Sequence, residues 1–304
     1  MIEVVNKSVV TIGTFDGVHI GHQKILSRLI KTAKKENLDA VVLTFFPHPR
    51  MVLQKDVEIK LINTIDERIA ILKSFGVDEI LVYPFSHEFS RLTAREYVEE
   101  ILVKKLKAKK VIIGYDHRFG RNRAADINDL KQLGKEFRFT VEEISKQDVD
   151  EVAVSSTKIR KAILEGDFDT ANKYLGKPFV INGKVEKGES VGKKLGFPTA
   201  NIKISESYKI IPKKGVYVVQ SQIEGKNFFG MMNIGNNPTF ENRKPSIEVY
   251  FLHFDGNLYD KSIQIEVLTR IRDEKKFHSV ELLVEAMQQD LKFTENYIQN
   301  LNND

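Results

Sequence analysis

The chain has 304 residues, 41% of them hydrophobic and 29% charged, which describes a globular protein with a substantial core and room for two domains of roughly 100–200 residues each. It contains no cysteine, and this excludes disulfides, thiolate metal ligands and a cysteine nucleophile. The net charge of +5 suits an enzyme that handles polyphosphates, whereas no RNA-binding sheet motif or zinc-finger spacing favours a nucleic acid partner.

The sequence carries no membrane or export signal. No apolar run approaches the roughly 20 residues of a membrane span, and the first residues lack a basic stretch followed by an apolar one. We therefore expect a cytoplasmic protein that acts on small molecules, with neither a membrane nor a nucleic acid as its partner.

Up to about residue 175, short apolar segments alternate with amphipathic helical patterns. The expected strands are Val9–Ile12, Ala40–Phe46, Glu79–Phe85, Lys110–Gly114 and Phe139–Ile144. The expected helices are Gln23–Glu36, Asp66–Phe75, Thr93–Leu106 and Asp126–Phe137, and Thr64/Glu67 and Thr93/Glu96 have capping-box spacing. Repeated β-α-β units predict a Rossmann-like α/β domain with a parallel sheet covered on both faces, and ligands bind beyond the carboxyl ends of such strands.

The segment Gly13–His22 reads GTFDGVHIGH and joins the first expected strand to the first expected helix. Its glycines let the backbone approach a ligand, and the free amides of a helix N-terminus attract an anion. His19 and His22 follow at the start of the helix, where imidazoles can donate hydrogen bonds to a phosphoryl group. One alternative is a capped helix with two surface histidines. Zinc is disfavoured, because the catalytic-zinc helix pattern needs histidines four residues apart with a glutamate between them.

A second helix start carries Ser155, Ser156, Thr157 and Arg160, on a short helix expected to end near Gly166. Hydroxyls commonly cap helices, but an arginine within one turn lets the same helix end grip several phosphate oxygens. We expect a triphosphate to be held between this cluster and the histidine pair. No Walker A loop and no dinucleotide-binding glycine motif is present in the sequence.

From about residue 178 the pattern becomes that of an all-β domain. The expected strands are Phe179–Val185, Gly215–Ile223, Phe228–Ile234, Ser246–Phe254 and Ser262–Ile271, and helix returns only near Ser279–Phe293. This predicts a small β-barrel or sandwich with one late helix. We place the boundary near Gly176–Pro178, which gives domains of residues 1–177 and 178–304.

Glu248 lies on an expected strand whose two faces are both apolar. A carboxylate between two apolar faces is costly unless it is paired or used, and burial would raise its pKa toward the value that a general base near neutral pH requires. The alternative is an ion pair with a lysine or arginine at the barrel rim.

Four segments of the first half together resemble a known family: GTFDGVHIGH, VSSTKIR, FFPHP and GYDHRFG are similar to motifs of the bacterial bifunctional riboflavin kinase/FAD synthetase family. The second half is similar to the same family in Gly192–Asn201, Asn233–Phe240, Ile247–Val249, Leu258–Tyr259 and Arg270–Phe277. The resemblance covers nearly the whole chain in order. His117 and Tyr250 depart from it, standing where phenylalanine and histidine are frequent.

The resemblance implies two enzymes in one chain. In the second half, Thr199 and Asn201 would hold Mg²⁺ and the terminal phosphates of ATP, and Glu248 would deprotonate riboflavin to give FMN. In the first half, FMN and a second ATP would give FAD and pyrophosphate, with His19, His22 and Arg160 as catalytic residues.

The resemblance also assigns ligand contacts to a larger set of residues. They are Gly13, Phe15, Asp16, Gly17, Gly21, His48, Asp116, Phe119, Ser155, Ser156, Thr157, Gly192, Lys193, Gly196, Pro198, Asn233, Arg270 and Arg272. Two alternatives stay open at this point: a nucleotidyltransferase of the same superfamily that acts on a pantetheine or nicotinamide phosphate, and a flavin- or nucleotide-binding regulator without catalysis.

Overall fold

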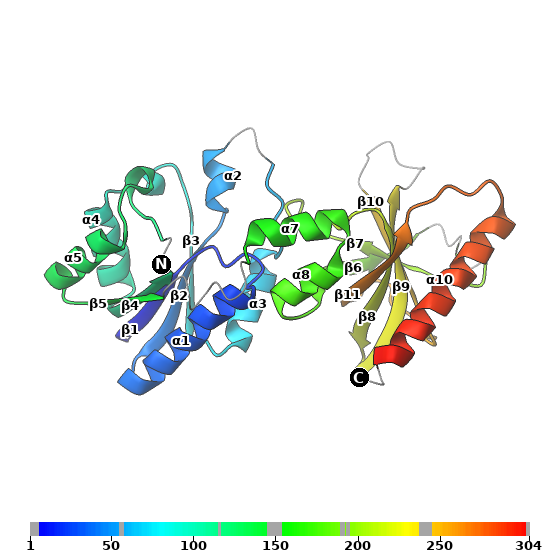
Figure 1. Ribbon diagram of the computed structural model, residues 1–304, viewed down its shortest axis with the longest axis horizontal. Coiled ribbons are helices and arrows are strands. Elements are labelled where there is room, and N and C mark those ends of the chain that lie inside the picture. The colour runs from blue at the N-terminus through cyan, green and yellow to red at the C-terminus, as the bar shows by residue number, and fades with distance from the viewer. Residues whose placement is uncertain are drawn as a thin grey trace. The chain divides into compact units, whose positions relative to one another are not determined.

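The computed structural model describes residues 6–54, 58–114, 117–144, 154–188, 192, 195–236 and 245–301. The chain forms two compact units, Met1–Ser156 and Thr157–Asp304, which we call the N-terminal and the C-terminal unit. Figure 1 shows an α/β arrangement in the first and a barrel in the second.

The N-terminal unit is built on a five-stranded parallel sheet. Its strand order is β3-β2-β1-β4-β5, and every pairing is parallel. The bounds are β1 (Ser8–Ile12), β2 (Asp39–Phe45), β3 (Glu79–Tyr83), β4 (Ala108–Gly114) and β5 (Thr140–Ile144). All five residues of β1 are buried, as expected for a central strand with helices on both faces. The predicted parallel sheet is confirmed.

Successive residues of the central strand enter different hydrophobic clusters. Val10 and Ile12 join the cluster that packs around η2 and α5, whereas Val9 joins the cluster around α1. The helical segments are α1 (Ile20–Glu36), α2 (Pro49–Leu53), α3 (Ile65–Ser74), η1 (Phe89–Arg91), α4 (Ala94–Tyr97), η2 (Val98–Lys105), η3 (Arg121–Arg123) and α5 (Ile127–Phe137). The capping boxes predicted at Thr64 and Thr93 are both formed.

Two helices precede the barrel: α7 (Ser156–Glu165) and α8 (Phe168–Leu175). The side chain of Asn172 on α8 donates to the carbonyls of Val267 (2.9 Å) and Leu268 (3.1 Å) and accepts from the amide of Phe179 (2.8 Å). These bonds attach α8 to the first and last barrel strands. The compact C-terminal unit begins at Thr157, and the functional boundary expected at residue 178 stays a prediction.

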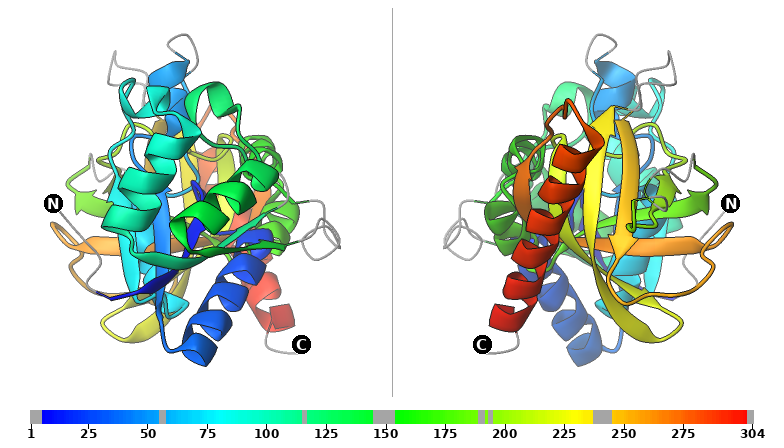
Figure 2. Two further views of the ribbon diagram at one scale, coloured as in Figure 1. Left: turned by 90° about the vertical axis from the view of Figure 1, so that its left-hand side faces the viewer. Right: turned by 90° about the vertical axis from the view of Figure 1, so that its right-hand side faces the viewer.

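The barrel is closed by six strands in the order β10-β7-β6-β11-β8-β9, all antiparallel. Its elements are β6 (Phe179–Glu186), β7 (Ala200–Lys203), β8 (Gly215–Ile223), β9 (Lys226–Asn236), β10 (Pro245–Phe251), β11 (Ser262–Asp273) and the late helix α10 (Val280–Leu301). Figure 2 shows α10 lying along the barrel wall, where Met287 and Leu291 pack with Met231 of β9. The predicted barrel with a terminal helix is confirmed, although β7 was not predicted and α10 runs beyond Phe293.

Candidate active sites

The Gly13–His22 segment forms the strand–turn–helix connection that the sequence predicts. The amide of Gly13 donates to the carbonyl of Leu43 (3.0 Å), and His19 is the N-cap of α1. Phe15 and Val18 have positive φ angles of 48° and 40°, a region that non-glycine residues rarely adopt. Such strained backbone clusters at ligand sites, which supports a functional role for this turn.

Asp16 connects the turn to neighbouring segments through hydrogen bonds. Its side chain is fully buried, and its two carboxylate oxygens accept from the amides of Ile62 and Asn63, each at 3.1 Å. Its backbone carbonyl accepts from the hydroxyl of Ser156 (2.9 Å), the first residue of α7. Asp16 thus acts within the protein, and the ligand contact predicted for it stays a prediction.

His19 and His22 stack on each other at the start of α1. Their ring centroids lie 3.7 Å apart at an interplanar angle of 17°, and Phe15 lies 5.0 Å from His22. The Nδ1 atom of His19 accepts from the amide of His22 (3.4 Å). The sequence therefore brings both predicted catalytic histidines together in one site.

Both imidazoles are held neutral. Burial lowers the pKa of His19 to about 4, against an opposing attraction from Asp16. Burial also lowers the pKa of His22 well below its usual value, and the neighbouring His19 and the cation of Arg68 lower it further. Since a neutral imidazole still carries one N–H, each ring can donate one hydrogen bond to an anion.

His48 follows β2 at the same edge of the sheet. It is the N-cap of α2, and its Nδ1 atom accepts from the amide of Arg50 (3.2 Å). The structure therefore gives this buried histidine a capping role, and the ligand contact predicted for it is still a prediction.

An aromatic cluster lies at the ends of β2 and β3. Phe89 lies 5.5 Å from Phe45 and 5.9 Å from Tyr97, and Tyr97 lies 5.6 Å from Phe119. His117 stacks near Phe119 at 6.0 Å. Sequence reasoning found Phe119 but missed the other rings, because they come from segments far apart in the chain. Asp116 lies outside the described residues.

The remaining residues of the second predicted cluster lie at the start of α7. Ser155 directly precedes this helix, and Thr157 and Arg160 follow on it. Thr157 is the first residue of the C-terminal unit. Ser156 contacts the Gly13–His22 segment through the hydrogen bond from its hydroxyl to the carbonyl of Asp16.

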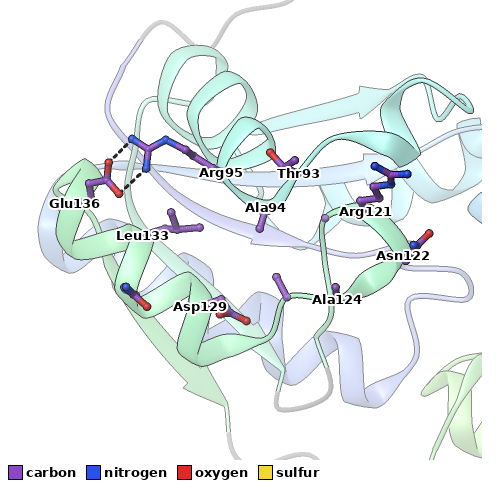
Figure 3. A pocket seen from close by; sticks show the side chains of 12 residues that line it. Thr93, Ala94, Arg95, Arg121, Asn122, Ala124, Asp129, Leu133 and Glu136 are labelled. Carbon is purple, nitrogen blue, oxygen red and sulfur yellow. Dashed lines mark hydrogen bonds and ion pairs between the residues drawn. The ribbon is translucent and has the colours of Figure 1, made fainter.

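A pocket of about 680 Å³ opens between the start of α4, the Gly120–Ala125 turn and α5. Figure 3 shows the ion pair of Arg95 and Glu136 at its rim, with one N–O distance of 2.8 Å. Its lining contains none of the predicted site residues, so we assign it no substrate. Its lining residues are Thr93, Ala94, Arg95, Gly120, Arg121, Asn122, Ala124, Ala125, Asp129, Gln132, Leu133 and Glu136.

In the barrel, the polar residues of three adjacent strands form one row. Glu248 of β10 is paired in register with Asn201 of β7 and with Asn233 of β9. The hydroxyl of Thr199 donates to Glu248 Oε2 at 3.2 Å. The predicted base and the predicted metal-binding residues are therefore neighbours.

Glu248 is half-buried, not buried as the sequence suggested. Ile247 and Val249 are buried, so the alternate side of β10, which carries Glu248, is the one less covered. Among the residues that the structure describes, no lysine or arginine forms an ion pair with Glu248. The rim ion pair considered above therefore finds no support in the described part of the chain.

The glycine-rich loop before β7 turns tightly. The carbonyl of Gly192 accepts from the amides of Leu195 (3.0 Å) and Phe197 (2.8 Å), and a Cβ at position 192 would lie 2.3 Å from the carbonyl oxygen of Phe197. Gly196 has a φ of 85°. A side chain would clash at position 192 and would strain the backbone at position 196. The loop leads through Pro198 directly to Thr199. Lys193 lies outside the described residues.

The two arginines predicted to contact ligand are engaged within the protein. Arg270 donates to the carbonyl of Lys214 (3.0 Å) and to Asp273 (2.5 Å). Arg272 makes a two-bond ion pair with Asp290 of α10, both bonds at 2.8 Å. These bonds connect β11 to the backbone of Lys214 and to α10. They do not test the ligand contacts predicted for the two arginines.

Glu274, directly after β11, was given no role from the sequence. A Cβ at Gly235 would lie 2.6 Å from its Oε1 atom and 3.2 Å from the side-chain nitrogen of Asn233. Glu274 and Asn233 therefore both lie close to Gly235, beside the row that contains Glu248. Glu274 belongs to the same Arg270–Phe277 segment as the two arginines, so this segment was the sequence signal that could have identified it.

Comparison with known proteins decides the family. The FAD synthetase family model matches residues 1–158, and the riboflavin kinase model matches residues 175–298. The chain belongs to the bifunctional riboflavin kinase/FMN adenylyltransferases. A bifunctional riboflavin kinase/FMN adenylyltransferase of Buchnera aphidicola subsp. Schizaphis graminum is 39% identical over 96% of this chain and 94% of its own length. One of Bacillus subtilis is 35% identical over 97% and 94%.

A solved structure supports the fold of this family member. A crystal structure titled as a macrolide-efflux protein from Streptococcus pneumoniae superposes with a TM-score of 0.88 at 34% identity, covering 97% of this chain and 96% of that one. None of the described helices combines the length and apolar character needed to cross a membrane. Within the described ranges, no group of three or more histidine, aspartate or glutamate side chains is arranged to hold a metal ion.

Proposed function

We propose that the barrel phosphorylates riboflavin with ATP to give FMN, and that the α/β unit joins FMN to the AMP moiety of a second ATP to give FAD. The observation that carries this proposal is the stacked, neutral pair His19–His22 at the start of α1, in a chain whose barrel places Thr199 against Glu248. The barrel then supplies FMN, which is the substrate of the α/β unit.

In the kinase reaction, Glu248 takes the proton from the ribityl 5′-hydroxyl of riboflavin. The hydroxyl oxygen attacks the γ-phosphorus of ATP, a new P–O bond forms, and ADP leaves. The hydroxyl of Thr199 holds one carboxylate oxygen of Glu248, which keeps the base oriented. Phosphoryl transfer depends mainly on such positioning and on neutralisation of charge.

The residues present fit a magnesium ion. The Thr199 hydroxyl, the Asn201 amide oxygen and the Glu248 carboxylate are oxygen donors on neighbouring positions, the ligand type that Mg²⁺ prefers. We propose that Thr199 and Asn201 hold this ion, which neutralises phosphate charge when bound. The loop through Gly192, Gly196 and Pro198 covers the phosphates.

In the adenylyltransferase reaction, a phosphate oxygen of FMN attacks the α-phosphorus of ATP. The bond between the α-phosphorus and the bridging oxygen breaks, and pyrophosphate leaves. His19 and His22 donate hydrogen bonds to the α-phosphoryl oxygens as negative charge builds there. Gly13, Gly17 and Gly21 keep the backbone of the turn open to the phosphates, and Ser155, Ser156, Thr157 and Arg160 hold the leaving pyrophosphate.

The aromatic cluster suits the planar rings of the substrates. Aromatic side chains bind flat rings through offset or edge contacts, and apolar pockets with few polar groups are typical of cofactor sites. We propose that Phe119 and Tyr97 contact the flavin. We also propose that the enzyme works in the cytoplasm, on free riboflavin, FMN and ATP.

One assay tests the proposal. Wild-type protein incubated with riboflavin, ATP and Mg²⁺ should give FMN first and then FAD, resolved by liquid chromatography. Replacing the flavin with phosphopantetheine or nicotinamide mononucleotide should give no adenylylated product. Formation of either product in place of FAD, or of no flavin nucleotide at all, would contradict the proposal.

A further inference from the structure

Helix α3 carries an arginine whose side chain is completely enclosed. Arg68 is 0% exposed, and it is one of the largest fully buried side chains of the chain. Arginine is almost never fully buried, because removing a cation from water costs several kcal/mol unless the surroundings compensate. The full burial of this cation therefore indicates that Arg68 has a specific role.

Hydrogen bonds connect Arg68 to the Gly13–His22 segment. Its Nη1 atom donates to the hydroxyl of Thr44 and to the carbonyl of Phe45, each at 3.3 Å, at the end of β2. The Thr44 hydroxyl in turn donates to the carbonyl of Thr14 (3.2 Å). Two hydrogen bonds therefore separate the guanidinium from the backbone of the turn.

The residues directly before α3 hold the same turn at a second point. The amides of Ile62 and Asn63 donate to the carboxylate of Asp16, and Thr64 then caps α3. The turn that precedes the two histidines is thus attached at Thr14 through Arg68 and at Asp16 through residues 62–63.

Arg68 also acts on His22 through its charge. Its cation lowers the pKa of His22, in the same direction as burial and the adjacent His19. Among the residues that the structure describes, the charged groups that act on this pair include Arg68 from α3, which affects His22, and Asp16 from the turn, which affects His19. A buried cation near the turn also favours an anion bound over it, since charges attract strongly where water is excluded.

We propose that Arg68 is a positioning residue for adenylyl transfer, which holds the Gly13–His22 segment in place and keeps a positive charge beneath it. The inference rests on the role proposed above for His22. It concerns the FAD-forming reaction only, because every contact that carries it lies within the N-terminal unit.

Three variants distinguish the hydrogen-bonded link between Arg68 and Thr14 from the positive charge of Arg68. R68M removes both, R68Q removes the charge but keeps donors, and T44V removes the hydroxyl that joins Arg68 to Thr14. R28M serves as control, since Arg28 is an exposed residue paired with Glu142 on the same unit. FAD formation from FMN is measured as kcat and as KM for ATP, and FMN formation on the same sample reports an intact chain.

R68M should lower kcat/KM for ATP in FAD formation by about tenfold or more, because small displacements of a reacting site cost up to about 10²-fold. R68Q should mainly raise KM, T44V should mainly lower kcat, and R28M should match the wild type. All four should form FMN within about twofold of the wild-type rate.

Titration of the His22 ring by NMR measures the pKa of His22. Replacing a residue with a merely structural role would leave this pKa unchanged. In R68Q the pKa of His22 should lie above its wild-type value, and in T44V it should stay near it. Folded Arg68 variants with wild-type FAD kinetics and an unchanged His22 titration overturn the inference. If neither Arg68 variant folds, T44V decides: wild-type FAD kinetics in T44V overturn it.

His22→Ala is assayed in parallel to distinguish two failures. If His22→Ala makes FAD at the wild-type rate, the role proposed for the histidines is wrong, and with it this inference. If His22→Ala is defective while the Arg68 and Thr44 variants are normal, only the inference about Arg68 fails.

Discussion

The hydroxyl of Thr199 donates a hydrogen bond to Glu248 Oε2 at 3.2 Å, between the residue that precedes β7 and the middle of β10. This bond holds one carboxylate oxygen of Glu248, the proposed base. Asn201 and Asn233 flank Glu248 in register on the two neighbouring strands. A short stretch of the barrel wall thereby brings together a carboxylate, a hydroxyl and two amides.

Glu248→Gln should abolish FMN formation and leave FAD formation from supplied FMN intact. Glutamine can still accept from Thr199 but cannot take a proton, and loss of a general base costs about 10²–10⁴ in rate. The measurement is kcat for riboflavin phosphorylation, together with the melting temperature. Glu266→Gln is the matched control, because Glu266 is a half-buried carboxylate of β11 in the same barrel. A stable Glu248→Gln protein with normal turnover would remove Glu248 from the mechanism.

His22→Ala should reduce FAD formation by about 10²–10³, the usual loss when one donor to a developing charge is removed. FMN formation should stay within about twofold, because no contact of His22 described above involves the barrel. Chromatographic separation of FMN and FAD from one reaction measures both at once. His87→Ala, at an exposed histidine of the same unit, should behave as wild type. An equal loss of both activities in a folded His22→Ala protein would argue against a role confined to adenylyl transfer.

The pKa of His19 predicts how stability depends on pH. Its folded value is about 4, below the ordinary 6.5, so the unfolded chain binds more protons between these two values. Acidification from about pH 6.5 to pH 4 should therefore destabilise the N-terminal unit by up to about 3 kcal/mol through His19. His19→Asn keeps an N-cap residue and should flatten this pH dependence, measured by denaturant unfolding at several pH values. An unchanged pH dependence in that variant would contradict the assignment.

Local sequence patterns were sufficient to predict the parallel sheet and the barrel, and they named residues that the structure places next to each other, namely His19 with His22 and Thr199 with Glu248. The turn at Gly13–His22 and the pair Thr199 and Asn201 are short motifs, so their neighbours in sequence are also their neighbours in space. The helix α8 and the strand β7 were missed because eight and four residues are too few to display a period.

Contacts between distant segments could not be predicted. Asp16 meets the backbone of residues 62–63, and Arg68 meets Thr44, across separations of 46, 47 and 24 residues. The burial expected for Glu248 failed for a related reason. Apolar residues on both faces of its strand suggested two covered faces, whereas in the closed barrel the side that carries Glu248 is only half covered.

The last prediction concerns where the kinase can be cut from the chain. Residues 157–304 should fold and form FMN, whereas residues 178–304 should be less stable, because the shorter fragment loses α7, α8 and the three hydrogen bonds of Asn172. It also exposes the barrel surface that the buried residues Phe168, Ala171 and Leu175 cover, at a cost of about 1.5–3 kcal/mol for each large apolar side chain.

Thermal unfolding and riboflavin phosphorylation of the two fragments are compared directly, with the full chain as reference. Asn172→Ala in the longer fragment isolates the hydrogen bonds, and it should lower stability by about 1–3 kcal/mol, since it leaves buried backbone groups without partners. Equal stability and equal kinase activity of the two fragments would show that α7 and α8 are dispensable, and would place the functional boundary at residue 178.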